Sequence, residues 1–234
     1  MAMQELLELL YPPRCLGCQL PGCQICPRCE SELESFIKVP RVAGKPLYSA
    51  LHYNEASSHL ILAAKESNDR AAARYLAALT SMRFARLHRE IPRTSYLLVP
   101  IPSSRAADFR RGFAHMTVLA KLIARAVESE HNVPCSVSPL LLPTRKVADQ
   151  SELSARDRAL NMNLAFTVNP KGRIARSGAG IIVVDDLVTT GSTITEAIRA
   201  LKVANFEPDA LLSACVAGRF LTNKISRSIR VDTR

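Results

Sequence analysis

Two adjacent carboxylates followed by a loop of small hydroxyl residues are the part of this sequence best suited to chemistry. Asp185 and Asp186 follow the apolar run of residues 181–184, and residues 189–193 read Thr-Thr-Gly-Ser-Thr. Such a loop at the start of a helix offers backbone N–H groups, hydroxyl donors and the positive end of the helix dipole, which together favour a phosphate. The carboxylates accept hydrogen bonds from vicinal hydroxyls or hold a hydrated Mg²⁺. A ribose 5-phosphate carries both a phosphate and a cis-diol, so it fits this arrangement.

The elements that position these residues must be a strand and a helix. Four β-branched residues at 181–184 indicate a strand covered on both faces, as in a parallel sheet. Ligands of such sheets bind beyond the carboxyl ends of the strands. Apolar residues then recur at helical spacing, at Ile194, Ala197, Ile198 and Leu201. The alternative is a buried strand followed by an ordinary capped helix that binds no ligand.

A cluster of cysteines near the N-terminus has the spacing of a metal site. Cys15 and Cys18 form one CxxC pair, and Cys26 and Cys29 form a second. In a protein of a reducing compartment, paired CxxC motifs indicate Zn²⁺ rather than disulfides, and four thiolates complete a closed structural site. We therefore expect these four as zinc ligands. Cys23 lies between the pairs and also has CxxC spacing with Cys26, so the choice of four among the five stays open at this point.

A second candidate ligand loop follows an apolar strand predicted at residues 96–99. The chain continues through Pro100 into a basic stretch that holds Arg105, Arg111 and Gly112. Guanidinium groups beside the end of a strand suit the oxygens of a pyrophosphate. The alternative is a solvated basic turn that leads into a helix over residues 113–130.

A polar stretch over residues 143–158 has the composition of a mobile flap. Its side chains Arg145, Gln150 and Arg158 would close over a bound phosphate. A simple surface excursion explains the same composition.

The remaining elements follow from periodicity. A helix over residues 56–65 ends in Lys65. A lysine at this position commonly serves only to interact favourably with the helix dipole. The inward residues of the 113–130 helix are Val118, Leu119, Leu122, Ile123 and Val127. Further helices are expected at residues 3–10, 70–88 and 193–203, and further strands at 47–53, 135–142 and 209–216.

Charge and composition limit the classes of protein that this chain can be. Apolar residues make up 47% of the 234 residues, enough for a packed core, and the net charge is +10. Residues 1–40 hold three basic and five acidic residues, a balance of −2, so residues 41–234 carry +12. A basic body suits phosphorylated metabolites, pyrophosphate or nucleic acid, and also serves solubility alone. No apolar run reaches membrane-spanning length and the N-terminus does not read as a signal peptide, so a cytoplasmic location is expected.

Several of these motifs resemble known families. The segment VVDDLVTTGST resembles the 5-phosphoribosyl 1-pyrophosphate (PRPP) motif of type I phosphoribosyltransferases. The order of the cysteine motif, VPIPSSRAADFRRGF, TRKVADQSELSARDRALNMNLAF and the PRPP motif resembles the ComF family over about residues 11–217. That family is associated with competence and DNA uptake. One departure is that Arg-Gly-Phe is followed here by Ala114 and His115 instead of the usual Asn-Gln, which puts a polar contact from these positions in doubt.

The resemblance implies a fold and a division of the chain. We expect an α/β fold, a type I phosphoribosyltransferase-like parallel sheet flanked by helices, with a small N-terminal four-cysteine zinc knuckle. The expected parts are a helix and zinc knuckle at 1–40, a phosphoribosyltransferase-like domain at 41–218 and a basic tail at 219–234.

The resemblance also implies roles for individual residues. Those expected to be catalytic are Asp185, Asp186, Lys65 and Arg105. Those expected to bind PRPP are Asp185, Asp186, Thr189, Thr190, Gly191, Ser192, Thr193, Arg105, Arg111, Gly112, Arg145, Gln150 and Arg158. Asn161 also falls on the flap.

The implied activity is Mg²⁺-dependent binding of PRPP with transfer of the phosphoribosyl group, a pentosyl transfer, to an unidentified acceptor. Catalysis would consist mainly of neutralising the pyrophosphate leaving group and positioning the sugar. The rival hypothesis is a non-catalytic protein that binds single-stranded DNA or the competence machinery and keeps the fold as a scaffold or PRPP sensor.

Overall fold

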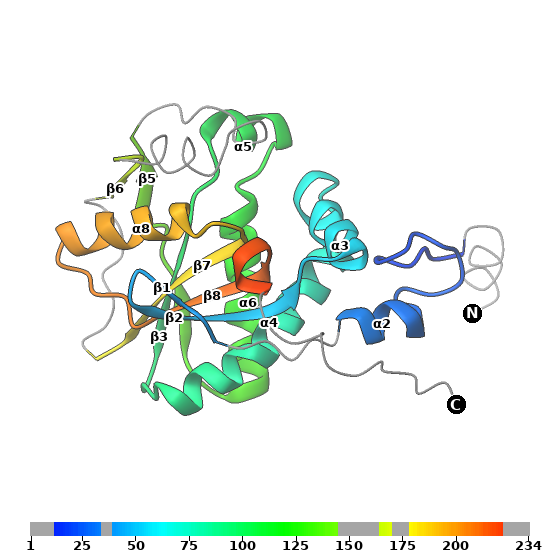
Figure 1. Cartoon of the computed structure of the whole chain (residues 1–234), viewed down its shortest axis with the longest axis horizontal. Coiled ribbons are helices and arrows are strands. Elements are labelled where there is room, and N and C mark those ends of the chain that lie inside the picture. Colours follow the sequence, from blue (N-terminus) through cyan, green and yellow to red (C-terminus); the bar gives the residue numbers. More distant parts are fainter. Residues whose placement is uncertain (1–11, 34–38, 145–163, 170–177, 222–234) are drawn as a thin grey trace, which may run out of the picture.

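A six-stranded sheet forms the centre of the protein (Figure 1). The computed structural model describes residues 12–33, 39–144, 164–169 and 178–221. The strand order is β1-β2-β8-β7-β3-β4, in which β1 and β2 are antiparallel and every other neighbouring pair is parallel. The strands are β1 (Arg41–Val42), β2 (Lys45–His52), β3 (Tyr96–Pro100), β4 (Cys135–Val137), β7 (Gly180–Val188) and β8 (Ala210–Val216). The apolar run of the sequence therefore lies on the central strand β7.

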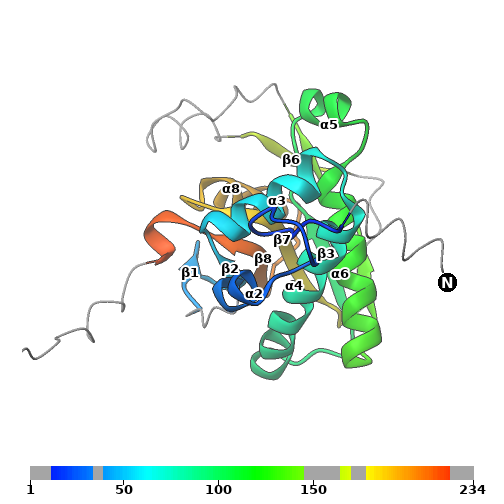
Figure 2. The ribbon, with the colours of Figure 1, turned by 90° about the vertical axis from the view of Figure 1, so that its right-hand side faces the viewer.

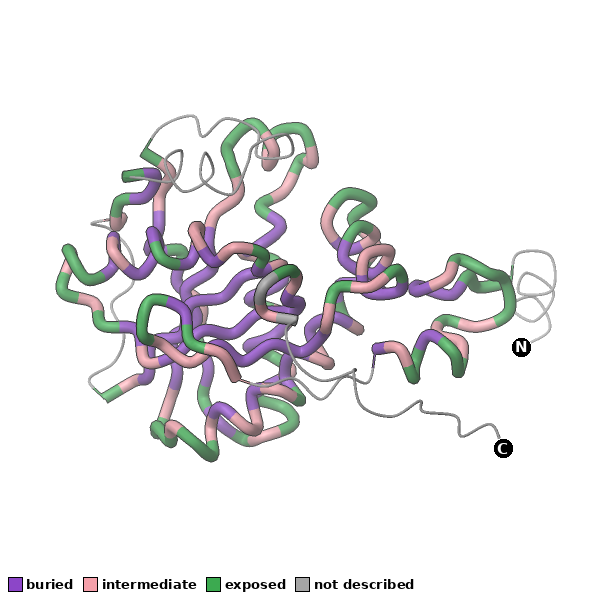
Figure 3. The backbone as a smooth tube through the Cα atoms, in the orientation of Figure 1, coloured by how far each residue is buried: buried purple, intermediate pink, exposed green. Residues whose placement is uncertain are grey.

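Helices cover both faces of this sheet (Figures 1 and 2). One face carries α3 (Glu55–Glu66), α4 (Arg70–Glu90) and α6 (His115–His131), and the other carries α8 (Ser192–Val203). Successive side chains of β7 alternate between the two faces, because Ile182 and Val184 belong to the first core cluster and Ile181 and Val183 to the second. The buried strands of Figure 3 are thus enclosed on both sides, and the expected fold class is confirmed.

The helix after the phosphate motif is amphipathic in the way that its sequence predicts. Ile194, Ala197, Ile198 and Leu201 are all buried against the sheet. The helix α3 is confirmed as well, with Leu60, Ile61 and Ala64 buried. Both helices were predicted correctly for the same physical reason. An apolar stripe along one side of a helix packs against the face of the sheet that the helix covers.

Three strand and helix predictions were wrong in detail. The central strand does not stop before the carboxylates but continues through them to Val188, because β8 pairs with it as far as that residue. The single strand expected at 135–142 is two strands, β4 and β5 (Leu141–Pro143), of which β5 pairs with β6 (Phe166–Val168) in a separate two-stranded sheet.

The region expected as one helix over 113–130 also differs. A short helix, α5 (Arg105–Arg111), ends at the left-handed Gly112, and α6 begins only at His115. Leu119, Ile123 and Val127 are buried as expected, whereas Val118 is exposed. Within the described part of the chain, no helix is both long and apolar enough to cross a membrane.

The N-terminal cysteine segment packs on α3 (Figure 1). It consists of a loop followed by α2 (Pro27–Leu33), and Cys15, Leu16, Cys29 and Leu33 belong to the same core cluster as α3 and the sheet. At the other end of the described chain, the short helix η2 (Gly218–Leu221) follows β8. The helix expected at 3–10 lies outside the described residues, as does the expected tail beyond residue 221.

Candidate functional site

Asp186 is the centre of a polar cluster at the carboxyl end of β7. The Nζ atom of Lys65 donates a hydrogen bond to Asp186 Oδ2 over 2.8 Å, and His115 Nε2 lies 3.5 Å from the same oxygen. Lys65 comes from the last turn of α3 and His115 from the first residue of α6. Residues more than a hundred positions apart therefore meet at one carboxylate oxygen. The role of Lys65 is therefore not limited to a favourable interaction with the dipole of its own helix, since its ammonium group binds Asp186.

This cluster keeps the Asp186 carboxylate ionised. Burial alone would raise the pKa of Asp186, but the nearby His115 imidazole and the charge and hydrogen bond of Lys65 outweigh it, so the pKa lies well below its usual range. Among the described residues, the buried His115 Nε2 makes no hydrogen bond. Burial likewise lowers the pKa of Lys65, and the charge of Asp186 reverses that effect, so the net pKa of Lys65 is raised. Asp186 and Lys65 thus form an ion pair in which the carboxylate is buried and the lysine side chain is half-buried.

Asp185 lies in a different environment because neighbouring side chains of a strand leave opposite faces. It faces the α8 side, where its register partner on β8 is Ser213, and Ser213 is paired in turn with Ser49 of β2. One Asp185 oxygen accepts a hydrogen bond from the Asp186 backbone N–H over 3.0 Å. Burial, and then the negative charge of Asp186, raise the pKa of Asp185 well above its usual value. The pKa values of the two neighbouring acids are therefore shifted in opposite directions.

The loop of residues 189–193 forms the start of α8. Gly191 occupies the N-cap position with a left-handed φ of 77° and, having no side chain, offers no side-chain cap. The Thr190 hydroxyl accepts a hydrogen bond from the Ser192 N–H over 3.3 Å. The hydroxyls of Thr190 and Ser192 lie 2.9 Å apart. Thr189 is exposed, and Thr190, Ser192 and Thr193 are partly exposed. A helix start with available N–H groups and neighbouring hydroxyls is an anion site by its electrostatics.

The basic residues of α5 have two different environments. The side chain of Arg111 is almost fully buried between Glu66 (3.2 Å) and Asp108 (2.9 Å), and its Nε has no hydrogen-bond partner among the described residues. Arg105 is exposed at the first position of the helix. Gly112 closes the helix in a left-handed conformation with φ of 74°. Arg111 therefore ties α5 to the end of α3, beside Lys65, whereas Arg105 is accessible to an anion.

Part of the predicted site cannot be placed on this cluster. Arg145, Gln150 and Arg158, together with Asn161, lie outside the described residues. Their expected contacts with a phosphate remain predictions.

The four cysteines of the two CxxC pairs converge as expected for a metal site. The Sγ atoms of Cys15, Cys18, Cys26 and Cys29 all lie within 4.8 Å of one another, and Cys23 is not part of this group. A tetrahedral zinc with Zn–S bonds of about 2.3 Å places its sulfurs roughly 3.8 Å apart. The Cys18–Cys26 sulfur distance is 3.8 Å. The arrangement is compatible with a structural Zn²⁺ held by the four predicted cysteines.

The cysteine site has one thiol that is already prepared to ionise. Burial opposes ionisation of Cys15, but hydrogen bonds from backbone N–H groups, including that of Cys26 at 3.3 Å, lower its pKa to about 6. Metal coordination deprotonates the remaining thiols. Cys135 and Cys215, by contrast, are buried, and burial raises the pKa of each thiol to about 12, which disfavours the thiolate form.

Sequence reasoning missed two contributors to this region. The departure from the family pattern put a polar contact from position 115 in doubt, yet His115 Nε2 lies 3.5 Å from Asp186 Oδ2. Glu66, which no motif singles out, lies 3.2 Å from the guanidinium group of Arg111. No local pattern reveals these roles, because both depend on contacts between distant segments.

Known proteins resemble this chain to different extents. It is similar to Competence protein F of Haemophilus influenzae, with 28% identity over 213 residues that cover 82% of this chain and 86% of the relative. It is also similar to DNA utilization protein YhgH of Escherichia coli, with 32% identity over 104 residues that cover 44% of this chain and 42% of that protein. No model of a protein family matches the sequence.

Two solved structures resemble the fold weakly. They are a hypoxanthine phosphoribosyl transferase of Trypanosoma cruzi and a hypoxanthine-guanine phosphoribosyltransferase of Schistosoma mansoni. The sequence identities are 14% and 17%, the TM-scores are 0.38 and 0.30, and each match covers 63% of this chain and 66% of the other. At these scores the likeness carries no argument about function.

Proposed function

The chain belongs to the ComF family, and on that premise we propose that it binds PRPP at the carboxyl end of β7, in a site designed for phosphoribosyl transfer. The observation that supports this most is that Asp185 and Asp186 on β7 are followed directly by the glycine-led, hydroxyl-rich start of α8. The 5-phosphate of PRPP suits the N–H groups and hydroxyls of residues 190–193. The ribose diol suits the two acids.

The opposite pKa shifts of the two acids assign them different tasks. Asp186, whose pKa is lowered, accepts a hydrogen bond from one ribose hydroxyl, and Asp185, whose pKa is raised, is the acid that is protonated more readily and can then donate one. The Lys65 ammonium holds one oxygen of Asp186 and adds positive charge near the pyrophosphate, while the exposed Arg105 is free to contact the outer oxygens of the pyrophosphate. Mg²⁺ carried on the pyrophosphate would neutralise the leaving group, and the Asp186 carboxylate would accept hydrogen bonds from the water ligands of the ion.

Calorimetric titration with PRPP and Mg²⁺ tests this assignment. The wild type is expected to bind, and the double variant Asp185→Asn/Asp186→Asn to bind about tenfold more weakly or worse, because each hydrogen bond to a charged group contributes about 1.5–3 kcal/mol. Glu207→Gln is the matched control, since Glu207 is an exposed carboxylate paired only with lysines away from the site. Equal affinity in all three proteins would refute the site. Release of pyrophosphate in the presence of a panel of nucleobases separates a transferase from a binding protein.

One surface feature favours a second candidate function, the binding of single-stranded nucleic acid. The ring of Phe109 on α5 is 89% exposed, Arg105 lies one helical turn earlier on the same side, and the adjacent Arg110 is also exposed. An exposed ring near guanidinium groups is suited to stack on an unpaired base, and the guanidinium groups are suited to contact the neighbouring phosphates. Relatives of this chain carry names that refer to competence and to DNA utilization. These observations support a role in DNA handling alongside PRPP binding.

Fluorescence anisotropy with a labelled oligothymidine over a salt series tests this second function. Phe109→Ala should weaken binding, whereas Met82→Ala, which removes another exposed apolar side chain on α4, should not. Affinity that does not change with salt, or that Phe109→Ala leaves intact, would count against it.

A further inference from the structure

The helix α3 connects the cysteine site with the cluster around Asp186. Its first half packs against the cysteine segment, and its last turn carries Lys65, whose ammonium group holds Asp186. His59 and Lys65 are six residues apart, so the two contacts lie about 9 Å apart along the helix axis. Neither the phosphate site nor the metal site by itself explains why one helix contacts both.

Two hydrogen bonds attach α3 to the cysteine segment. His59 Nδ1 lies 2.5 Å from the carbonyl oxygen of Gly17, which is in the loop between Cys15 and Cys18. A carbonyl only accepts, so Nδ1 must carry the proton in this contact. The side chain of Asn54, the N-cap residue of α3, donates from Nδ2 to the carbonyl oxygen of Glu32 on α2 over 3.1 Å. The helix is therefore tied both to the loop and to α2, the two pieces that the metal would hold together.

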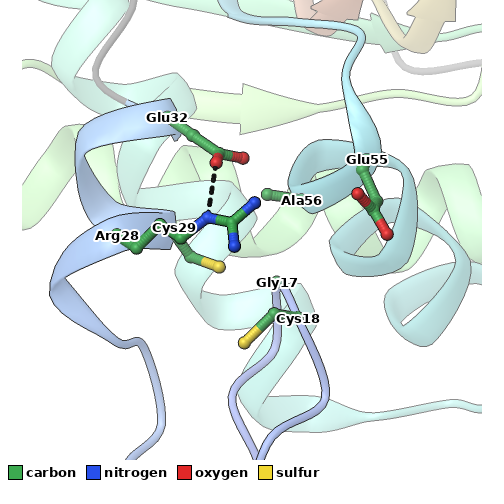
Figure 4. Close-up of a pocket in the computed structure, with 7 residues that line it drawn as sticks. All are labelled: Gly17, Cys18, Arg28, Cys29, Glu32, Glu55 and Ala56. Carbon is green, nitrogen blue, oxygen red and sulfur yellow. Dashed lines mark hydrogen bonds and ion pairs between the residues drawn. The ribbon is translucent and has the colours of Figure 1, made fainter.

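The packing at this junction has no spare room around Gly17. A Cβ atom at that position would lie 2.8 Å from Cβ and Sγ of Cys29 and 3.2 Å from Cβ of Ala56 on α3. Beside it, Figure 4 shows a small pocket into which Arg28 and Glu55 project at the rim. The loop, α2 and α3 thus meet in direct contact at Gly17, and a shift of the loop must be transmitted to α3.

We propose that His59 is a positioning residue that ties α3 to the metal-bound cysteine segment and thereby holds Lys65 against Asp186. Metal at the four cysteines fixes the Gly17 and Glu32 carbonyls, these hold α3, and α3 presents Lys65 to the site. Zinc occupancy and affinity for the anionic ligand are therefore coupled, and the part of this inference that concerns the ligand rests on the proposed binding of PRPP.

The physical reason for coupling is that the cysteine segment has little core of its own. A segment of this size depends on its metal for most of its folding free energy, so loss of zinc frees both carbonyls at once. The first half of α3 then loses its two hydrogen bonds to the cysteine segment but keeps that of Ser57 to the His52 carbonyl oxygen, and Lys65 keeps its hydrogen bond to Asp186. A helix held by fewer contacts at one end samples more orientations, and Lys65 spends less time in the geometry that the ligand requires.

The test combines two variants with removal of zinc. His59→Leu removes the donor to Gly17, and His59→Asn places an amide N–H near the position of Nδ1. Zinc content, PRPP affinity by calorimetry and hydrogen exchange of the α3 amides are measured with and without a zinc-selective chelator, with Mg²⁺ kept in excess. His59→Leu should retain zinc, bind PRPP about tenfold more weakly and exchange α3 amides faster, whereas His59→Asn should resemble the wild type. Chelation should weaken PRPP binding by the wild type to a similar extent and have little further effect on His59→Leu.

Several outcomes would overturn the coupling. The first is a His59→Leu protein that contains zinc and has the PRPP affinity and the α3 hydrogen exchange of the wild type. The second is that chelation and substitution weaken PRPP binding in a fully additive way. If His59→Leu does not retain zinc, Asn54→Asp replaces it, since aspartate keeps the helix cap to Ser57 but cannot donate to Glu32. Hydrogen exchange needs no PRPP, so faster α3 exchange on chelation supports the attachment even if the wild type fails to bind PRPP, an outcome that would refute only the proposed function.

Discussion

Replacing Asp185 with asparagine should stabilise the folded protein at neutral pH. Asp185 is 9% exposed, lies beside the ionised Asp186 and receives one hydrogen bond from a backbone N–H, which an asparagine oxygen also accepts. Because burial and the charge of Asp186 raise its pKa, the folded state holds this group neutral at a pH where the unfolded chain would ionise it. The carboxyl group therefore lowers stability above its unfolded pKa, and asparagine removes that penalty.

The sign and size of the effect follow from linkage. A group whose folded pKa is raised favours folding fully below its unfolded pKa and loses that contribution as the pH rises. The gain from Asp185→Asn should accordingly be near zero at about pH 4 and grow toward pH 7. Neutral replacements at strained functional positions commonly gain about 1 kcal/mol, which corresponds to about 2–4 °C in Tm for a chain of this size. Scanning calorimetry between pH 4 and pH 8 measures it.

Asp186→Asn is the matched control, with the opposite sign. Its folded pKa is lowered, so its contribution to stability is present at neutral pH and disappears as the pH falls below the usual aspartate value. Removing it leaves Lys65 without its partner and should lower Tm at pH 7. If Asp185→Asn lowers Tm at pH 7, or changes it equally at every pH, the described electrostatics of the site are wrong.

Three other predictions concern the rest of the site. Gly191→Ala should cost about 1–2 kcal/mol, because its left-handed φ disfavours a side chain, and should weaken PRPP binding; unchanged Tm and affinity would contradict the described start of α8. Ser213→Ala should change stability by less than about 1 kcal/mol in urea unfolding, since the buried hydroxyl has no partner among the described residues, and a larger loss would reveal a hydrogen bond to it. Metal analysis of freshly purified protein should find about one equivalent of zinc in Cys23→Ser and much less in Cys26→Ser; the reverse pattern would refute the ligand set.

The sequence predicted the central strand, the helix after it and the four cysteines because each is encoded locally. The apolar run of β7, the stripe of α8 and the CxxC spacing are all contained in short segments. The end of β7 was not predictable in the same way, since its extension to Val188 depends on pairing with the distant strand β8. The pairing of β5 with β6, rather than with the main sheet, is a similar non-local choice.

The side chains around the acids show the same division. Asp185 and Asp186 stand out in the sequence, but the contacts of Asp186 with Lys65 and His115 arise from the way α3 and α6 end over β7. Arg111 was predicted to bind a pyrophosphate, and the structure places its guanidinium between Glu66 and Asp108. Residue type indicated chemistry in each case, and only the packing of distant helices decided which groups meet.

The most direct test of the PRPP site is a crystal structure of the protein with PRPP and Mg²⁺. The 5-phosphate is predicted to lie against the backbone N–H groups at the start of α8, and a ribose hydroxyl within hydrogen-bond distance of Asp186. Density for PRPP in another part of the molecule, or none at the start of α8 at saturating PRPP, would contradict the account.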